Sequence, residues 1–102
     1  MTIVPGEVEA ALLEHSRIDR VAIIALPDPR MGERACACVI TADGRPIELD
    51  ELTAFLAKQS IARYMWPERV ELFDEFPFTP SLKVRKQGLV ELVIARDQVA
   101  AS

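Results

Sequence analysis

Two short, almost wholly apolar segments restrict the fold of this chain more than any other feature. Residues 21–26 read VAIIAL and residues 35–40 read ACACVI, with no charged side chain in either. Apolar runs of this length, bounded by proline and glycine, are typical of strands that are buried on both faces. The connecting residues 27–33 allow antiparallel pairing, and helices are then expected to cover both faces of the sheet.

Segments with helical spacing flank these two strands. Apolar residues recur at intervals of three and four from Pro5 to His15, and again over residues 49–59. Proline suits the first position of a helix, and acidic residues suit its first turn. His15 is the only histidine and is expected near the end of its helix in a structural role. No neighbouring pattern of serine, cysteine or carboxylate would make it a general base.

The last helix is predicted to begin near Lys83 or Val84. Gly88 lies inside it, although glycine is a poor helix former. The residues expected on its buried face are Leu89, Leu92 and Val93. The preceding residues 76–81 are rich in proline and cannot form regular structure, because proline lacks an N–H donor and restricts the residue before it.

An alternating segment over residues 69–73 predicts a third, shorter strand, which follows a compact connection over residues 61–67. The expected order is helix, strand, strand, helix, strand, helix. This order predicts an α+β fold in which a small three-stranded β-sheet is covered by about three helices. Residues 1–102 are expected to form a single domain, because the chain is long enough for one modest core.

The charge balance excludes several classes of function. Twelve Lys and Arg against sixteen Asp and Glu give a net charge of −4, so the chain lacks the basic surface that binds nucleic acid. No apolar run reaches the roughly 18–20 residues that span a bilayer. The first residues carry no pattern of a secretory signal. We therefore expect a cytoplasmic protein with no membrane span and no nucleic-acid partner.

The two cysteines, Cys36 and Cys38, alternate within the second apolar run. Alternate residues of a strand point to the same face, a geometry that does not suit a disulfide between them. No further Cys or His lies close enough in the sequence to suggest a zinc site. We expect two buried, reduced thiols and no metal site in this chain.

A self-contained active site is not visible in the sequence. An enzyme of this size should show a nucleophile with its base, paired carboxylates or a metal cluster, and phosphate-binding glycine motifs are also missing. The feature that stands out is Lys83, which follows a proline-rich loop beside Arg85 and Lys86. From these residues alone two interpretations stay open: a solvated lysine, or a compact positive charge that projects into another domain's site.

Four segments resemble, in order and spacing, the C-terminal domain of the adenylate-forming superfamily. This superfamily comprises acyl- and aryl-CoA synthetases, luciferases and nonribosomal-peptide adenylation domains. Ile3–Glu9 resembles the segment after its interdomain hinge, and Val21–Ile40 resembles its "V-x-V-P-D…G-E-x-x-x-A-x-V" hairpin. Ala62–Pro67 is similar to its "L-x-x-Y-x-x-P" motif, and Leu72–Lys86 to its terminal "P-x-T-x-x-G-K-V-x-R" motif.

The resemblance implies a two-step ligase. ATP and a carboxylic acid would form an acyl-adenylate and pyrophosphate, and coenzyme A would then yield a thioester and AMP. It implies that Lys83 is the catalytic lysine of adenylation. Binding roles toward the cofactors, at the interdomain and CoA side, are expected for Arg85, Lys86, Gly32 and Glu33. Mg²⁺ is expected only with a large N-terminal domain, which would be the partner of this domain and is absent from this chain.

One residue departs from the family motif. Leu82 stands where the family has glycine before the lysine, and glycine alone adopts positive φ without a penalty. Three explanations stay open: the loop does not need that conformation, delivery of Lys83 is impaired, or the residue was changed deliberately. The alternative to a ligase domain is therefore a free-standing α+β interaction or regulatory module. A nonribosomal-peptide adenylation domain is a third option. The identity of the carboxylic acid does not follow from this sequence, because the resemblance places the acid-binding pocket in the large N-terminal domain.

Overall fold

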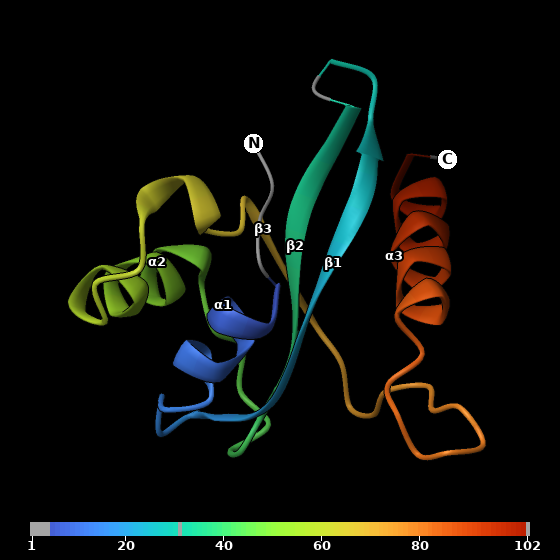
Figure 1. The fold of residues 1–102 in the computed structure, drawn as a ribbon. Coiled ribbons are helices and arrows are strands. Elements are labelled where there is room, and N and C mark those ends of the chain that lie inside the picture. Colours follow the sequence, from blue (N-terminus) through green and yellow to red (C-terminus); the bar gives the residue numbers. More distant parts are fainter. Residues whose placement is uncertain (1–4, 31, 102) are drawn as a thin grey trace.

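The computed structural model describes residues 5–30 and 32–101 of the 102-residue chain (Figure 1). These residues form three helices, one 3-10 helix and a three-stranded sheet, which confirms the predicted α+β fold class. The elements in chain order are α1 (Pro5–Leu12), β1 (Ile18–Asp28), β2 (Gly32–Thr41), α2 (Leu49–Lys58), η1 (Arg63–Met65), β3 (Arg69–Leu72) and α3 (Lys86–Ala101). Ile3 and Val4 of the first motif lie outside the described residues.

The two apolar runs form the predicted antiparallel hairpin. β1 and β2 pair from Ile18 opposite Thr41 to Asp28 opposite Gly32, with one irregularity near the start of β1. Both strands are longer than their apolar runs because the flanking polar residues continue the ladder of hydrogen bonds. Gly32 has φ +81°, a left-handed conformation that glycine adopts without a steric penalty where the chain enters β2.

β3 pairs with the other side of β2, in parallel, from Cys36 opposite Arg69 to Val39 opposite Leu72. The sheet order is therefore β1-β2-β3, with β1 and β3 at its edges. Parallel neighbours require a crossover connection, and α2 with η1 supplies it. The predicted compact connection contains η1, where Met65 is buried and the Trp66 indole N–H donates to the Ile61 carbonyl at 2.9 Å.

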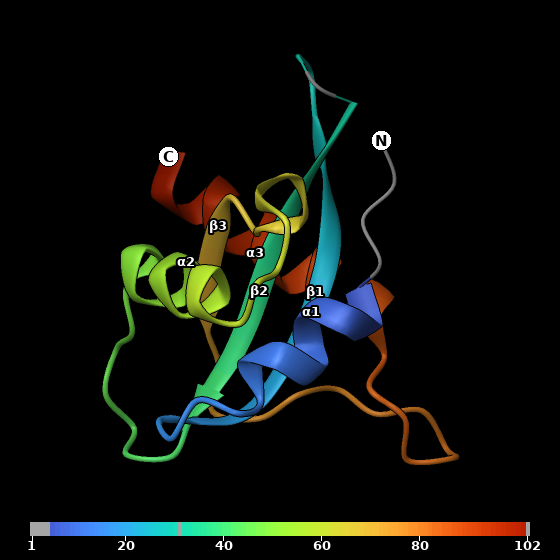
Figure 2. The same cartoon turned by 60° about the vertical axis from the view of Figure 1, so that its left-hand side comes forward.

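Helices cover both faces of the sheet, as the apolar runs predicted (Figures 1 and 2). α1 and α2 pack on one face, where Ile23 and Ala37 join a core with Leu52 and Leu56. α3 packs on the opposite face over a second core. That second core contains Ala22, Ile24, Leu26, Cys36, Cys38, Phe76, Leu89 and Val93. Each fully buried aliphatic side chain contributes about 1.5–3 kcal/mol, so the two layers hold the sheet from both sides.

Cys36 and Cys38 lie side by side in this second core, and both are fully buried and free. The expectation of two reduced, buried thiols is confirmed. The two thiols share a hydrogen bond, which together with burial raises the pKa of Cys38. The same hydrogen bond lowers the pKa of Cys36, against the opposing effect of burial.

Two details of the helix predictions are wrong. α3 begins at Lys86 rather than near Lys83 or Val84, because the backbone before it makes a different set of hydrogen bonds. Leu89 and Val93 are buried as predicted, but Leu92 is 45% exposed. A step of three residues from Leu89 turns Leu92 toward the edge of the helix face, where no element of the described chain covers it.

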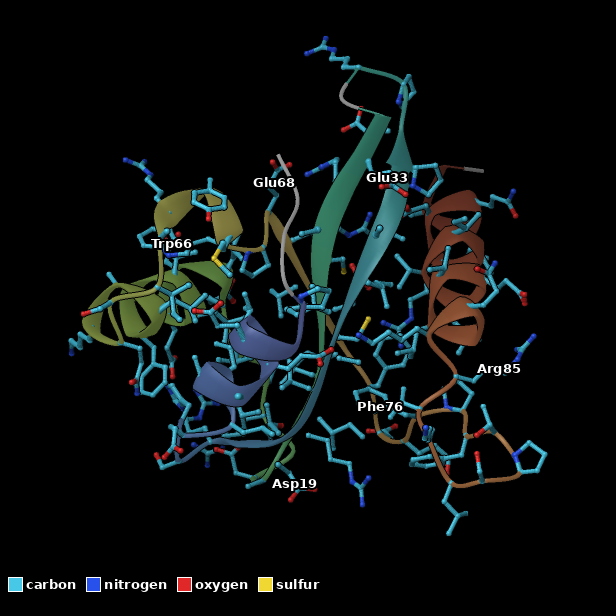
Figure 3. The ribbon with its side chains drawn as sticks, viewed as in Figure 1. Asp19, Glu33, Trp66, Glu68, Phe76 and Arg85 are labelled. Atoms are coloured by element: carbon cyan, nitrogen blue, oxygen red, sulfur yellow. The ribbon has the colours of Figure 1, made fainter. Side chains whose placement is uncertain are left out.

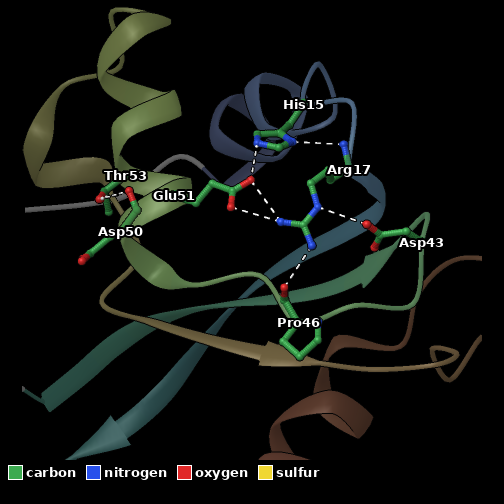
Figure 4. Close-up of polar contacts among 7 residues, drawn as sticks. All are labelled: His15, Arg17, Asp43, Pro46, Asp50, Glu51 and Thr53. Atoms are coloured by element: carbon green, nitrogen blue, oxygen red, sulfur yellow. Dashed lines mark hydrogen bonds and ion pairs between the residues drawn. The ribbon is translucent and has the colours of Figure 1, made fainter.

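α1 ends at Leu12, before His15, and the turn that follows is held by polar contacts (Figure 4). His15 Nε2 lies 3.0 Å from Glu51 Oε2, and its ring packs edge-on against Phe55. Arg17 donates to Glu51 at 3.1 Å, to Asp43 at 3.3 Å and to the Pro46 carbonyl. These contacts join the start of β1 to α2, so His15 has the structural role expected for it.

A second group of charges joins β3 to α3. Arg69 donates to the two carboxylate oxygens of Asp97 at 2.9 and 2.6 Å and also pairs with Glu71 at 2.8 Å. Arg96 pairs with Glu71 at 3.0 Å. The hydrogen bonds from Arg69 lower the pKa of Asp97 below its ordinary value of 3.8.

No helix among residues 5–30 and 32–101 is long and apolar enough to cross a membrane.

Candidate functional site

Residues 77–85, here named the lysine loop, fold back on themselves between the sheet and α3. Phe78 and Val84 form an antiparallel bridge, and the Arg85 N–H donates to the Pro77 carbonyl at 2.8 Å. This pairing keeps the backbone extended just before α3, which is why that helix starts later than its sequence pattern predicts.

Thr79 and Lys83 are the two residues that close the tip of the lysine loop. The Thr79 N–H donates to the Lys83 carbonyl at 2.7 Å, and the Leu82 N–H donates to the Thr79 carbonyl at 2.9 Å. The Thr79 hydroxyl accepts the Lys83 N–H at 3.3 Å and lies 3.0 Å from Ser81 Oγ. The backbone of Lys83 is thus fixed on both sides, while its side chain extends from a tight turn.

Leu82 adopts φ +64°, so the lysine loop does use the left-handed conformation at the motif's glycine position. A non-glycine residue pays roughly 1–2 kcal/mol there, because its Cβ crowds the following carbonyl. Leu82 is 82% exposed, so burial of its side chain does not offset this strain. The explanation that the loop avoids positive φ is therefore wrong.

Two contacts hold the base of the lysine loop against the body of the domain. Phe76 is 4% exposed and packs edge-on against Phe73 at 5.9 Å, which anchors the chain as it enters the loop (Figure 3). Pro77 packs against Gly88 in the first turns of α3. A Cβ at position 88 would lie 3.0 Å from Pro77 Cγ, so the glycine allows this close approach.

Arg20 of β1 reaches the lysine loop from the side. Its guanidinium carbon lies 5.6 Å from the centre of the Phe78 ring, within range of a cation–π contact. A depression of about 400 Å³ beside the loop is lined by Leu13, Asp19, Arg20, Val21, Phe76 and Val84. The edge strand, the helix α1 region and the loop therefore share one surface.

The three cations of this region have different surroundings. Within residues 5–30 and 32–101, the exposed Lys83 ammonium makes no ion pair. Arg85 lies 3.9 Å from Glu91 and is half exposed (Figure 3). Lys86 instead pairs closely with Glu9 of α1, at 2.8 Å. Of the three, Lys83 is the cation that makes no ion pair among the described residues.

Gly32 and Glu33 lie at the tip of the β1–β2 hairpin, at the opposite end of the domain from the lysine loop (Figures 1 and 3). Both are exposed. The structure therefore divides the residues selected from the sequence into two separate surfaces. Lys83, Arg85 and Lys86 lie at one end, and Gly32 and Glu33 lie at the other.

Thr79, Glu9 and Arg20 were not selected from the sequence, although each contacts the lysine loop or its end. Thr79 was visible as part of the proline-rich motif, but nothing in the sequence shows which backbone group it accepts. Glu9 and Arg20 come from segments far from the loop, and only the fold brings them together.

Among the described residues, no three His, Cys, Asp or Glu side chains lie close enough to hold a metal ion.

Residues 7–83 match the model of the family described as AMP-binding enzyme C-terminal domain. Among curated relatives, the medium-chain fatty-acid–CoA ligase of Escherichia coli is 37% identical over 81 residues, which is 78% of this chain and 14% of that protein. The 2,3-dihydroxybenzoate-AMP ligase of Bacillus subtilis is 40% identical over 87 residues, 85% of this chain and 16% of that protein.

A solved structure agrees with this assignment. The apo structure of MbtA from Mycobacterium smegmatis superposes with a TM-score of 0.84 at 31% identity, over 89% of this chain and 17% of that one. The chain thus spans only about a sixth of the length of the proteins it matches. In sequence and in fold, the chain belongs to the AMP-binding enzyme C-terminal domain family of the adenylate-forming ligases.

Proposed function

We propose that this domain supplies the adenylation lysine, Lys83, to an ATP-dependent acid–CoA ligase. The partner is a large N-terminal domain in the same enzyme, which binds ATP, the carboxylic acid and Mg²⁺. The observation that carries the proposal is the lysine loop itself. It fixes the backbone of Lys83 through Thr79 and leaves the ammonium exposed, without an ion pair among the described residues.

The chemistry of adenylation suits such a cation. The carboxylate of the acid must approach the α-phosphate of ATP, and negative charge grows on the phosphoryl oxygens as the new bond forms. An ammonium held against that charge in a water-excluded site stabilises the transition state by about 2.7–4 kcal/mol. Lys83 has a compact charge on a flexible stem, and a fixed backbone reduces the entropy lost when it reaches the site.

The opposite end of the domain suits the second step. After pyrophosphate leaves, rotation of the domain would withdraw Lys83 and present the hairpin tip with Gly32 and Glu33 to the CoA site. Their separation from the lysine loop along the β1–β2 hairpin supports this division of roles (Figure 1). Arg85, half exposed beside the loop, remains a candidate for contacts with the nucleotide.

The relatives differ in the activity that they are named for: one is a CoA ligase and another is an AMP ligase. We propose coenzyme A as the acceptor. An assay of thioester formation with coenzyme A and with a carrier protein would decide between them.

The test of the proposal is Lys83→Ala in the complete enzyme, with the two half-reactions measured separately. Adenylation, followed as pyrophosphate exchange, should fall by about 10²–10³-fold, since one well-placed donor is lost. Thioester formation from preformed acyl-adenylate should be unchanged. Equal loss in both half-reactions would remove Lys83 from this role.

The second candidate is a free-standing α+β interaction or regulatory module with the same fold. Leu82 favours it, because its positive φ places strain beside the lysine that a ligase must deliver. An uncovered apolar groove lined by Phe73, Leu92, Ala95, Arg96, Val99 and Ala100 is also suited to protein contact. The module would be excluded if the coding sequence before this domain encodes, in frame, a large domain with a Ser/Thr/Gly-rich phosphate loop.

A further inference from the structure

An ion pair joins the first helix of the domain to the first residue of the last. Lys86 Nζ lies 2.8 Å from Glu9 Oε2, and the two side chains are 44% and 21% exposed. Glu9 belongs to α1 and Lys86 begins α3, so the pair connects helices that cover opposite faces of the sheet. It does so around β1, which is an edge strand.

Glu9 has a second contact that fixes its carboxylate in place. The same Oε2 atom accepts the backbone N–H of Ile23 in β1 at 2.7 Å. A carboxylate held by a strand N–H loses little further freedom when it binds an ammonium, which makes this pair better placed than two mobile surface charges. Lys86 is therefore tied to the sheet as well as to α1.

Lys86 also follows directly after the lysine loop. The entry of the loop is anchored by buried Phe76, and its two arms are joined by the hydrogen bond from Arg85 to Pro77. The Glu9–Lys86 pair adds the anchor at the exit. Without it, the turn between the loop and α3 would be fixed only from the loop side and by the buried residues further along the helix.

We propose that Glu9 is a positioning residue for Lys83, and that it acts through Lys86. The pair sets the exit of the lysine loop relative to α1 and β1, and so fixes the direction in which Lys83 leaves the domain. Lys86 thereby has a positioning role instead of the cofactor-binding role expected from the sequence. This inference rests on the proposed function of Lys83 and adds a partner from the other end of the sequence.

The structure contains a matched control for a purely stabilising effect. Arg96 pairs with Glu71 at 3.0 Å, with exposed fractions of 44% and 18%, close to those of Lys86 and Glu9. Arg96 lies on the same helix but in its C-terminal half, away from the lysine loop (Figure 1). A variant at Arg96 therefore removes a similar ion pair, together with a cation–π contact of 4.1 Å to the Phe73 ring, and leaves the exit of the loop untouched.

The test uses three single variants of the complete enzyme and the double variant of Glu9 and Lys86. Glu9→Gln keeps an oxygen that accepts the Ile23 N–H but removes the charge that binds Lys86. Lys86→Met keeps most of the apolar stem and removes the ammonium, and because this side chain is partly exposed the variant should fold even if Glu9→Gln does not. Arg96→Met is the control. Adenylation, thioester formation from preformed adenylate and the melting temperature are measured for each.

We expect Glu9→Gln and Lys86→Met each to lower kcat of adenylation about fivefold, since a small displacement of the reacting group costs rate. KM for ATP and thioester formation should not change. The double variant should be no slower than either single one, because both remove the same interaction. Arg96→Met should lower the melting temperature by a similar amount without slowing adenylation.

Several results would overturn the inference. Unchanged adenylation in Lys86→Met and Glu9→Gln, or an equal loss in Arg96→Met, would leave the pair with a stabilising role only. A raised KM for ATP or coenzyme A in Lys86→Met alone would restore Lys86 as a cofactor ligand. The Lys83→Ala variant separates these results from failure of the proposed function: if Lys83→Ala slows adenylation as expected while Glu9→Gln leaves it unchanged, only the positioning role fails.

Discussion

Thr79 and Lys83 hydrogen-bond each other in both directions: the amide of Thr79 donates to the carbonyl of Lys83, and the hydroxyl of Thr79 accepts the amide of Lys83. The loop thus fixes the Cα of Lys83 without using its side chain. Replacement of Thr79 by valine keeps the shape and removes the acceptor. A lost hydrogen bond of this kind is worth about 1 kcal/mol, so adenylation in the complete enzyme should slow about fivefold. Thr79→Ser, which keeps the hydroxyl, should retain the rate, and a slow serine variant would contradict this role.

Leu82 offers a test of backbone strain. Leu82→Gly should relieve roughly 1–2 kcal/mol of strain at φ +64° and lose about 0.5–1 kcal/mol through the greater freedom of the unfolded chain. The net expectation is a modest gain in the free energy of unfolding, seen as a rise of a few degrees in melting temperature. Leu82→Ala is the control, since it shortens the exposed side chain but keeps the Cβ. A rise as large in the alanine variant would show that φ is not the cause.

Replacement of Gly88 by alanine should lower the free energy of unfolding, although alanine is a better helix former than glycine by about 1 kcal/mol. The new Cβ would lie 3.0 Å from Pro77 Cγ, and the rigid proline ring would have to move together with the base of the lysine loop. We expect Gly88→Ala to lower the free energy of unfolding by about 1 kcal/mol and to slow adenylation. In a Pro77→Ala background the same substitution should cost less. An equal cost in both backgrounds would place the conflict elsewhere.

Cys36 and Cys38 should be unreactive in the folded domain. Both are fully buried, and burial with the shared hydrogen bond raises the pKa of Cys38. Since the thiolate is the reactive form, a thiol reagent should modify neither residue under native conditions and both after unfolding. Counting modified thiols with and without denaturant measures this. Rapid labelling of the folded chain would mean that this face of the sheet opens readily.

The Asp97–Arg69 pair should contribute to stability in a pH-dependent way. Arg69 holds the pKa of Asp97 below 3.8, so the folded state favours the ionised carboxylate. Stability from this group is present above its unfolded pKa and is lost as pH falls through the lower folded pKa. Asp97→Asn should therefore be less stable than the parent at neutral pH, and the two should converge in acid. Denaturant unfolding across that range measures the difference in the free energy of unfolding between Asp97→Asn and the parent. A difference that does not change with pH would show that Asp97 has the same pKa in the folded and unfolded states.

The sequence predicted the fold where local pattern decides structure. The runs around Ile23 and Cys36 are too apolar to lie anywhere but between two layers, so the hairpin and its helical cover followed from them. The start of α3 and the exposure of Leu92 could not be predicted in this way. The first depends on the pairing of Phe78 with Val84, and the second on which neighbours the helix meets.

For the site, the sequence motif identified Lys83, but its supports are contacts between distant segments. Glu9 reaches Lys86 around the edge strand β1, and Arg20 reaches Phe78 from the same strand. No periodicity in the sequence encodes such pairs. The conformation of Leu82 was an open question from the sequence because leucine does not report φ, and it was answered only by the backbone itself.

The parallel pairing of β3 with β2 has a consequence for the order of folding. The β1–β2 hairpin needs only a short turn to form, whereas β3 must wait until the chain has closed the longer connection through α2. Phe76 and α3, which support the lysine loop, follow β3 and dock on a face that the first hairpin has already built. We expect the part of the domain that presents Lys83 to be the last to acquire its native shape during folding.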